Sequence, residues 1–124
     1  ILDMAWHGGK TPEDILSVKE FEAQAFSETQ LYPDVTENCM STAFSHIFQG
    51  GYSAGYYSYK WAEILDADAF EYFQEKGIFN KEVAYKFKEH ILSRGGTEKP
   101  MVLYKRFRGK EPRPEALLKR AGLL

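Results

Sequence analysis

The sequence has little cysteine, little net charge and no long apolar run, and each absence excludes a class of protein. Cys39 is the only cysteine of the 124 residues, which excludes an internal disulfide framework and predicts a reducing, cytoplasmic compartment. The 16 basic and 18 acidic side chains leave a net charge of −2, which excludes a generally basic nucleic-acid binder and an acidic disordered tail. No apolar run approaches the roughly 18 residues of a membrane span, and no basic segment followed by an apolar core indicates a signal peptide. We therefore expect neither a nucleic-acid nor a membrane partner.

What the sequence does contain is typical of one globular domain. Hydrophobic residues make up 44% and charged residues 27% of the chain, enough to bury a core within a single domain. The first residue is Ile1 and not methionine, so we expect the chain to be a piece of a longer protein.

The pattern of apolar residues predicts an all-α fold of about five helices, because helical spacing recurs and no alternating strand pattern appears. Thr11-Pro12 begins a predicted helix over about 12–29, since Thr is a good cap and Pro suits the first turn. A loop at 30–41 and a glycine-rich segment at 42–51 follow. We expect the rest, 52–124, to be helical. The predicted helices there are a long one from 52 to 76 ending at Gly77, one capped by Asn80 that ends at Gly95-Gly96, one capped by Thr97 and closed by Gly109, and a last one through Arg120.

Tyrosine is concentrated in one place, since four of the eight tyrosines lie between residues 52 and 59. On a helical wheel, one face holds Tyr57, Trp61, Ile64 and Leu65, and the opposite face holds Tyr52, Tyr56 and Tyr59. The first face suffices for packing. The second aligns three phenols, which donate hydrogen bonds without net charge and suit a developing oxyanion or peptide carbonyls.

Glycines surround this tyrosine segment. Gly50 and Gly51 precede it and allow a sharp turn or a close approach of a ligand backbone. Gly55 lies inside the predicted helix, where glycine costs about 1 kcal/mol relative to alanine, and so also indicates a close approach. From the residues alone, a ligand-binding face and a simple core face whose hydroxyls reach the surface are about equally well supported.

Three further patterns suggest other functions, and each of these functions has weaker support in the sequence. His7, His46, His90 and Cys39 are candidate zinc ligands, although their spacing fits no short-range zinc pattern. Cys39 with His46 is a candidate nucleophile and base, although a single thiol is more often a small buried apolar group. A basic cluster near the C-terminus invites a nucleic-acid interpretation, although cations at helix C-termini also complement the helix dipole; its members are Lys105, Arg106, Arg108, Lys110 and Arg113.

The eighteen residues from Phe44 to Trp61, FSHIFQGGYSAGYYSYKW, closely resemble a signature of the thimet oligopeptidase-like zinc metallopeptidases. Further blocks agree in the same order: GIFN at 77–80, ILSRGG at 91–96 and KRFRGKEP at 105–112. The resemblance is strong over 42–124 and weak over 1–41, and the oligopeptidase A and peptidyl-dipeptidase branch is the most similar.

The resemblance implies a role for each residue of the tyrosine segment. In this family the glycine-rich loop and the following helix form one wall of a substrate cleft. Tyr59 would donate its hydroxyl to the scissile carbonyl oxygen and stabilise the oxyanion. His46, Tyr52 and Tyr56 would hold short peptide substrates, and Gly50 and Gly51 would let the loop move. Tyr57 and Trp61 would be structural.

The sequence departs from the family at the metal. In this family an H-E-x-x-H motif on one helix supplies two zinc-ligating histidines and the Glu general base, and a Glu from a later helix completes the zinc site. This sequence has no H-E-x-x-H motif. We therefore expect zinc in the full-length protein, ligated by a missing N-terminal part, and none bound by this chain. The chain alone is expected to be a C-terminal fragment that is inactive, pairs with that missing part and self-associates. Two alternatives stay open: a free-standing helical peptide-binding module, and a structural domain whose tyrosines form an interface.

Overall fold

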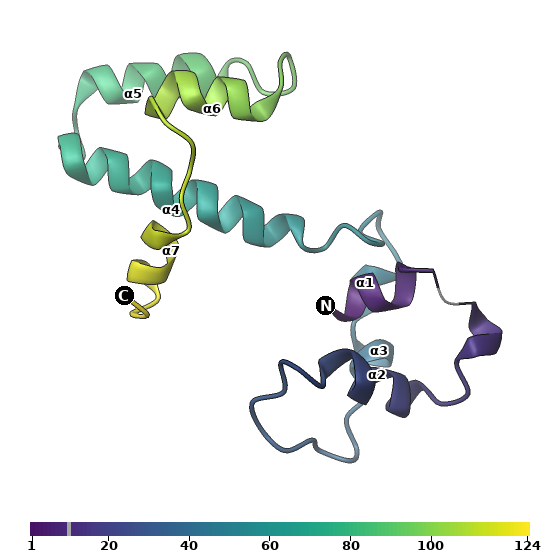
Figure 1. The fold of residues 1–124 in the computed structure, drawn as a ribbon. Helices are drawn as coiled ribbons and strands as arrows, with labels where there is room; N and C mark the ends of the chain where they lie inside the picture. The colour runs from purple at the N-terminus through teal and green to yellow at the C-terminus, as the bar shows by residue number, and fades with distance from the viewer. Residues whose placement is uncertain (10) are drawn as a thin grey trace. The chain divides into compact units, whose positions relative to one another are not determined.

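The structure is a computed structural model that describes residues 1–9 and 11–124, and the described chain is helical with no strand (Figure 1). The predicted all-α class is therefore confirmed. The chain forms two compact units, residues 1–58 and 59–124, and each is described by itself. Where about five helices were predicted, the described residues contain seven α-helices together with two 3₁₀ turns and one π-helix.

The first unit is built from short helices. These are α1 (Leu2–His7), a 3₁₀ turn at Pro12–Asp14, α2 (Val18–Phe26), α3 (Met40–Ala43) and a 3₁₀ turn at Ser45–Ile47. Leu2, Phe21 and Ile47 form its buried centre, and partly buried residues such as Trp6 and Phe44 pack around them. Because each helix is too short to be stable alone, this shared core holds the unit together.

The prediction of one helix over 12–29 was wrong at its start. Thr11 does not cap a long helix; its backbone N–H and its hydroxyl donate to Asp14 at 2.8 and 3.1 Å, which closes a single 3₁₀ turn. The helix begins only at Val18, because the hydroxyl of Ser17 accepts the N–H of Glu20 at 3.3 Å and caps it.

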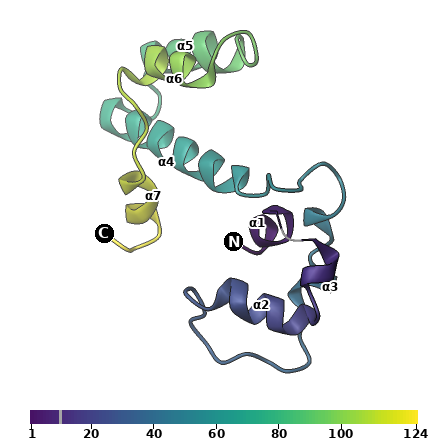
Figure 2. The ribbon, with the colours of Figure 1, turned by 45° about the vertical axis from the view of Figure 1, so that its right-hand side comes forward.

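The second unit contains the long helix α4 (Ser58–Lys76), followed by α5 (Lys81–Phe87), a π-helix at Lys88–Leu92, α6 (Pro100–Arg108) and α7 (Glu115–Arg120). In Figures 1 and 2, α6 runs back alongside α5. The predicted Asn80 cap is confirmed, since its side chain accepts the N–H groups of Glu82 and Val83. Gly77 and Gly109, the predicted helix ends, both adopt positive φ.

Two of the helix starts predicted after residue 51 were wrong. Residues 52–57 form turns, so α4 begins at Ser58 and not at 52. Ala54 has a φ of 55°, which is incompatible with a right-handed helix. Thr97 does not cap α6; its hydroxyl donates to the carbonyl of Arg94 at 2.8 Å, and α6 begins three residues later at Pro100.

The core of the second unit lies between α4, α5 and α6. Ala69, Val83, Tyr104 and Phe107 are buried there, with Leu65, Tyr72 and Phe87 among the side chains packed against them. Of the helices in the described residues, none is both long enough and apolar enough to cross a membrane.

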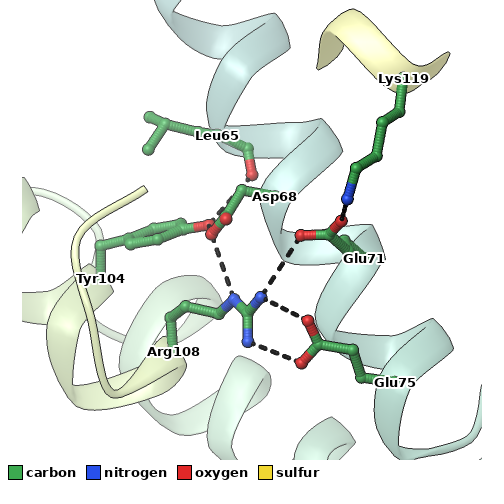
Figure 3. A network of polar contacts seen from close by, with 7 residues as sticks. All are labelled: Leu65, Asp68, Glu71, Glu75, Tyr104, Arg108 and Lys119. Atoms are coloured by element: carbon green, nitrogen blue, oxygen red, sulfur yellow. Dashed lines mark hydrogen bonds and ion pairs between the residues drawn. The ribbon is translucent and has the colours of Figure 1, made fainter. Parts of the chain in front are cut away.

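A buried polar network joins α4 to α6 beside this core (Figure 3). Arg108 donates to Asp68 at 3.2 Å and makes two hydrogen bonds of 3.1 Å to Glu75. The hydroxyl of Tyr104 donates to Asp68 at 2.6 Å. Burial and the Asp68 carboxylate both raise the pKa of Tyr104 strongly, so this phenol stays a hydrogen-bond donor.

Candidate functional site

Four aromatic rings from residues 44–56 gather in one cluster in the first unit. The His46 ring lies 5.9 Å from that of Tyr52 and 6.1 Å from that of Tyr56, measured between centroids. The two tyrosine rings are 5.9 Å apart, and Phe44 meets Tyr56 edge-on at 4.6 Å. The structure thus brings together three of the predicted substrate-binding residues, His46, Tyr52 and Tyr56.

The loop that carries this cluster is attached to the core of the first unit through Ile47. Ile47 is fully buried, while its neighbour His46 is exposed. The hydroxyl of Ser53 donates to the carbonyl of Ile47 at 2.8 Å and closes the loop. Gly50 and Gly51 have φ values of 73° and 79°, a conformation that glycine adopts without strain. The loop therefore requires glycine at these positions for its backbone path.

A buried carboxylate from α1 holds the far end of the same loop. Asp3 is 5% exposed, and it accepts the N–H of Ala54 at 2.8 Å and the N–H of Tyr56 at 3.0 Å. The ring of His7 lies 2.9 Å from the same carboxylate. Burial by itself raises the pKa of Asp3, but the two backbone hydrogen bonds and His7 outweigh it, and the pKa is lowered below its ordinary value of 3.8.

A second buried carboxylate, from α2, holds the start of α3. Glu22 is 8% exposed and accepts the N–H groups of Met40 and Ser41. The thiol of Cys39 donates to the same carboxylate at 3.4 Å. The partner of Cys39 is thus an acidic group and not His46, so the arrangement does not support the suggested nucleophile formed with His46.

Tyr59 lies in the first turn of α4, belongs to the second unit and is 46% exposed. Because α4 starts at Ser58, Tyr52 and Tyr56 lie in turns before the helix, so the predicted row of three phenols on one helical face was wrong. Gly55 also lies outside the helix, and a Cβ added there would make only ordinary contacts, the nearest at 3.5 Å from the Tyr52 carbonyl oxygen.

The predicted packing face of α4 is only partly correct. Leu65 packs against the core, but Tyr57 and Trp61 are 57% and 54% exposed in this chain. The reason is that the core of the second unit begins at Leu65, one turn further along α4 than Trp61. Trp61 instead lines a mainly apolar hollow of about 710 Å³ within the second unit, together with residues such as His90 and Met101.

The described residues do not fit a metal ion. Among residues 1–9 and 11–124, no three His, Cys, Asp or Glu side chains come together in a group that could ligate one. His7 is engaged with Asp3, and His90 lies in the π-helix of the second unit. A private zinc site formed by the three histidines and Cys39 therefore has no support in this part of the chain.

The basic cluster near the C-terminus is largely engaged in ion pairs. Arg106 makes two hydrogen bonds to Glu98, at 2.7 and 2.8 Å, and Lys105 pairs with Glu111. Arg108 is buried in the network of Figure 3. These contacts account for three of the five cations and leave little of the surface that a nucleic-acid backbone would need.

Asp3 and Glu22 are the residues that sequence reasoning missed. Asp3 lies in the first turn of α1, where an acidic residue is common because it complements the helix dipole, and Glu22 lies in the middle of α2. Their partners lie 51 and 53 residues away for Asp3 and 18 and 19 residues away for Glu22. No local pattern in the sequence signals such contacts.

Similarity to known proteins extends over almost the whole chain. The model of peptidase family M3 matches residues 1–123, including the N-terminal part where the motif resemblance is weak. The chain is 46% identical over 123 residues to oligopeptidase A of Escherichia coli (strain K12), which covers 99% of the chain and 18% of that protein. It is 42% identical over 127 residues to a probable cytosolic oligopeptidase A of Arabidopsis thaliana and 40% identical over 124 residues to a dipeptidyl carboxypeptidase of E. coli, each over 99% of the chain and 18% of the relative. The chain thus spans about a fifth of the length of these relatives.

Proposed function

The chain belongs to peptidase family M3, and we propose that it is the part of a zinc-dependent oligopeptidase or peptidyl-dipeptidase that supplies the substrate-binding wall. The observation that carries the proposal is the cluster of His46, Tyr52 and Tyr56 on a loop with two positive-φ glycines. Relatives named oligopeptidase A and dipeptidyl carboxypeptidase act on peptides, and we extend short peptides as the substrate class to this chain.

In this proposal each residue has a role that fits the chemistry of its side chain. Imidazole and phenol groups on the loop hold the peptide by hydrogen bonds and ring contacts, which is the role of His46, Tyr52 and Tyr56. Gly50 and Gly51 let the loop approach the peptide backbone closely. Tyr59 donates its neutral hydroxyl to the scissile carbonyl oxygen, where negative charge develops.

Zinc belongs to the rest of the proposed full-length protein. A zinc ion there would supply an activated water for attack on the peptide bond. Because the described residues offer no group that could ligate it, we propose that the metal ligands and the general base lie in the missing zinc-bearing part, and that this chain alone binds no zinc and is inactive. We propose a cytoplasmic location, in line with a probable cytosolic relative, although another relative is organellar.

The proposal is tested in the full-length peptidase with a fluorogenic peptide substrate. Tyr59→Phe is expected to lower kcat by about 100-fold with little change in KM, because removing one oxyanion donor costs about that much. Tyr57→Phe is the matched control, since it removes the neighbouring phenol and should leave kcat unchanged. If Tyr59→Phe retains the parent kcat, Tyr59 has no oxyanion role and the proposal fails at that residue.

A free-standing peptide-binding module makes a different prediction. Such a module would bind a short peptide as the 124-residue chain by itself, at an affinity equal to that of any longer form. We expect the isolated chain to bind a short peptide substrate much more weakly than the full-length protein, measured by calorimetry with a zinc-free full-length sample as the comparison. Equal affinities would favour the module.

We also propose that the isolated chain self-associates. Tyr57, Trp61, Phe70 and Phe79 are between 49% and 94% exposed, and large exposed apolar side chains favour association. Light scattering should give a mass that rises with concentration, and a constant mass equal to the 14.3 kDa of one chain would refute this.

A further inference from the structure

Asp3 is placed where it determines the shape of the tyrosine-bearing loop. Its carboxylate reaches the loop through two hydrogen bonds, from the N–H of Ala54 to one oxygen and from the N–H of Tyr56 to the other. The two donors are two residues apart in the chain, so one carboxylate spans the turn that contains Gly55. Both oxygens of this buried, charged carboxylate therefore accept hydrogen bonds from the same short segment.

The backbone held in this way is strained. Ala54 has a φ of 55°, the only positive φ of a residue other than glycine among the described residues. An alanine occupies that region only when its surroundings impose it, and such strain is often found at functional sites. The hydrogen bond from the N–H of Ala54 to Asp3 joins the strained residue itself to the core of the first unit.

The position of the Tyr56 ring depends directly on this backbone conformation. Tyr56 packs edge-on against Phe44 at 4.6 Å and lies within about 6 Å of both His46 and Tyr52, as the centroid distances of 6.1 and 5.9 Å show. A shift of the backbone at 54–56 would therefore displace the ring that touches every other member of the cluster.

We propose that Asp3 is the positioning residue of the site: its carboxylate holds the backbone of Ala54 and Tyr56 in the conformation that assembles the His46, Tyr52 and Tyr56 cluster for a peptide. The hydrogen-bond geometry stands without the proposed function, but the consequence for peptides rests on it. In this proposal Asp3 acts on the peptide only through the loop that it holds.

Glu22 provides a matched control within the same unit. It is a buried carboxylate that accepts two backbone N–H groups, as Asp3 does, but its partners are Met40 and Ser41 at the start of α3. Asp3→Asn and Glu22→Gln each replace one acceptor oxygen with an NH₂ group that faces a donor. The two variants therefore carry the same kind of defect at different places.

The first experiment uses the 124-residue chain and measures amide hydrogen exchange by NMR. In Asp3→Asn, the amides of Ala54 and Tyr56 should exchange at least about tenfold faster, whereas in Glu22→Gln the faster exchange should be confined to Met40 and Ser41. Unchanged exchange of Ala54 and Tyr56 in Asp3→Asn would overturn the inference. If Asp3→Asn unfolds the first unit, Asp3→Glu keeps the charge and displaces it by one methylene, and the same two amides are measured.

The second experiment uses the full-length peptidase and separates KM from kcat. Asp3→Asn should raise KM for a peptide by about tenfold and change kcat far less, because misplaced binding groups weaken substrate positioning. Glu22→Gln should leave KM within about twofold of the parent value at a comparable loss of Tm. An unchanged KM in Asp3→Asn overturns the positioning role.

The two proposals fail in different ways. If Tyr59→Phe lowers kcat while Asp3→Asn leaves KM unchanged, the proposed function stands and the role of Asp3 falls. If amide exchange at Ala54 and Tyr56 responds to Asp3→Asn while none of the tyrosine variants affects peptide hydrolysis, Asp3 holds the loop but the loop is not the substrate-binding wall.

Discussion

Arg108 donates a hydrogen bond of 3.2 Å to Asp68, 40 residues earlier in the chain, and the two side chains are only 4% and 1% exposed. Two further bonds of 3.1 Å join the same guanidinium to Glu75, and the guanidinium carbon lies 4.7 Å from the centre of the Tyr72 ring. Figure 3 shows the contacts of Arg108 with Asp68 and Glu75 between α4 and α6. A single side chain of α6 thus pairs with two carboxylates of α4 that lie about two turns apart.

Replacing Arg108 should therefore destabilise the second unit strongly. We expect Arg108→Met to lower the free energy of unfolding by roughly 3–5 kcal/mol, because it leaves the Asp68 carboxylate buried without its cation. Urea unfolding followed by circular dichroism measures the change. Arg106→Met is the control, since Arg106 lies two residues away on the same helix and pairs with Glu98 at the surface, where ion pairs contribute little. Equal losses in the two variants would contradict the assigned role of the buried network.

The glycines of the loop make a prediction about conformation alone. A Cβ added to Gly51 would meet nothing within 4 Å, yet its φ is 79°, so Gly51→Ala should cost about 1–2 kcal/mol through backbone strain only. Gly55→Ala should be neutral or slightly stabilising, because its φ is not positive and the added methyl has room. Thermal unfolding of both variants measures the difference. A loss in Gly55→Ala as large as that in Gly51→Ala would refute this account of the loop.

The lowered pKa of Asp3 predicts how the first unit responds to acid. A carboxyl group whose pKa is lower in the folded state stabilises the fold above its unfolded pKa, here about 3.8, and this stabilisation is lost as the pH falls through the folded value. The difference in unfolding free energy between the parent and Asp3→Asn should thus be full at pH 7 and shrink below about pH 3.8. The measurement is urea unfolding of the two proteins between pH 7 and pH 2.5. A difference that stays constant over this range would show that the charge of Asp3 does not contribute.

The proposed division of the site predicts the zinc content of the chain. After equilibration with zinc at neutral pH and desalting, elemental analysis should find far less than one zinc per chain, because the described residues contain no group of three ligands. The full-length peptidase, treated in parallel, should retain zinc. One tightly held zinc per isolated chain would mean that this chain forms a metal site of its own.

Much of the helical content follows from the sequence alone. Asn80 and Gly109 mark helix ends in the sequence and in the structure, because a side-chain acceptor and a residue able to adopt positive φ act within one turn of the backbone. The resemblance from Phe44 to Trp61 likewise pointed to the family that the comparison identifies over residues 1–123. Caps, helix ends and a contiguous motif depend on residues close together in the chain, so the sequence alone is enough to predict them.

Tertiary structure decided where the tyrosines lie and what holds them. Tyr52 and Tyr56 have helical spacing with Tyr59, but they lie in turns because Asp3, more than 50 residues away, accepts the N–H groups of Ala54 and Tyr56. The concentration of tyrosine and the single cysteine could be read from the sequence, whereas the buried carboxylate of Asp3 that shapes the loop could not, since a contact between distant residues leaves no periodic trace in the chain.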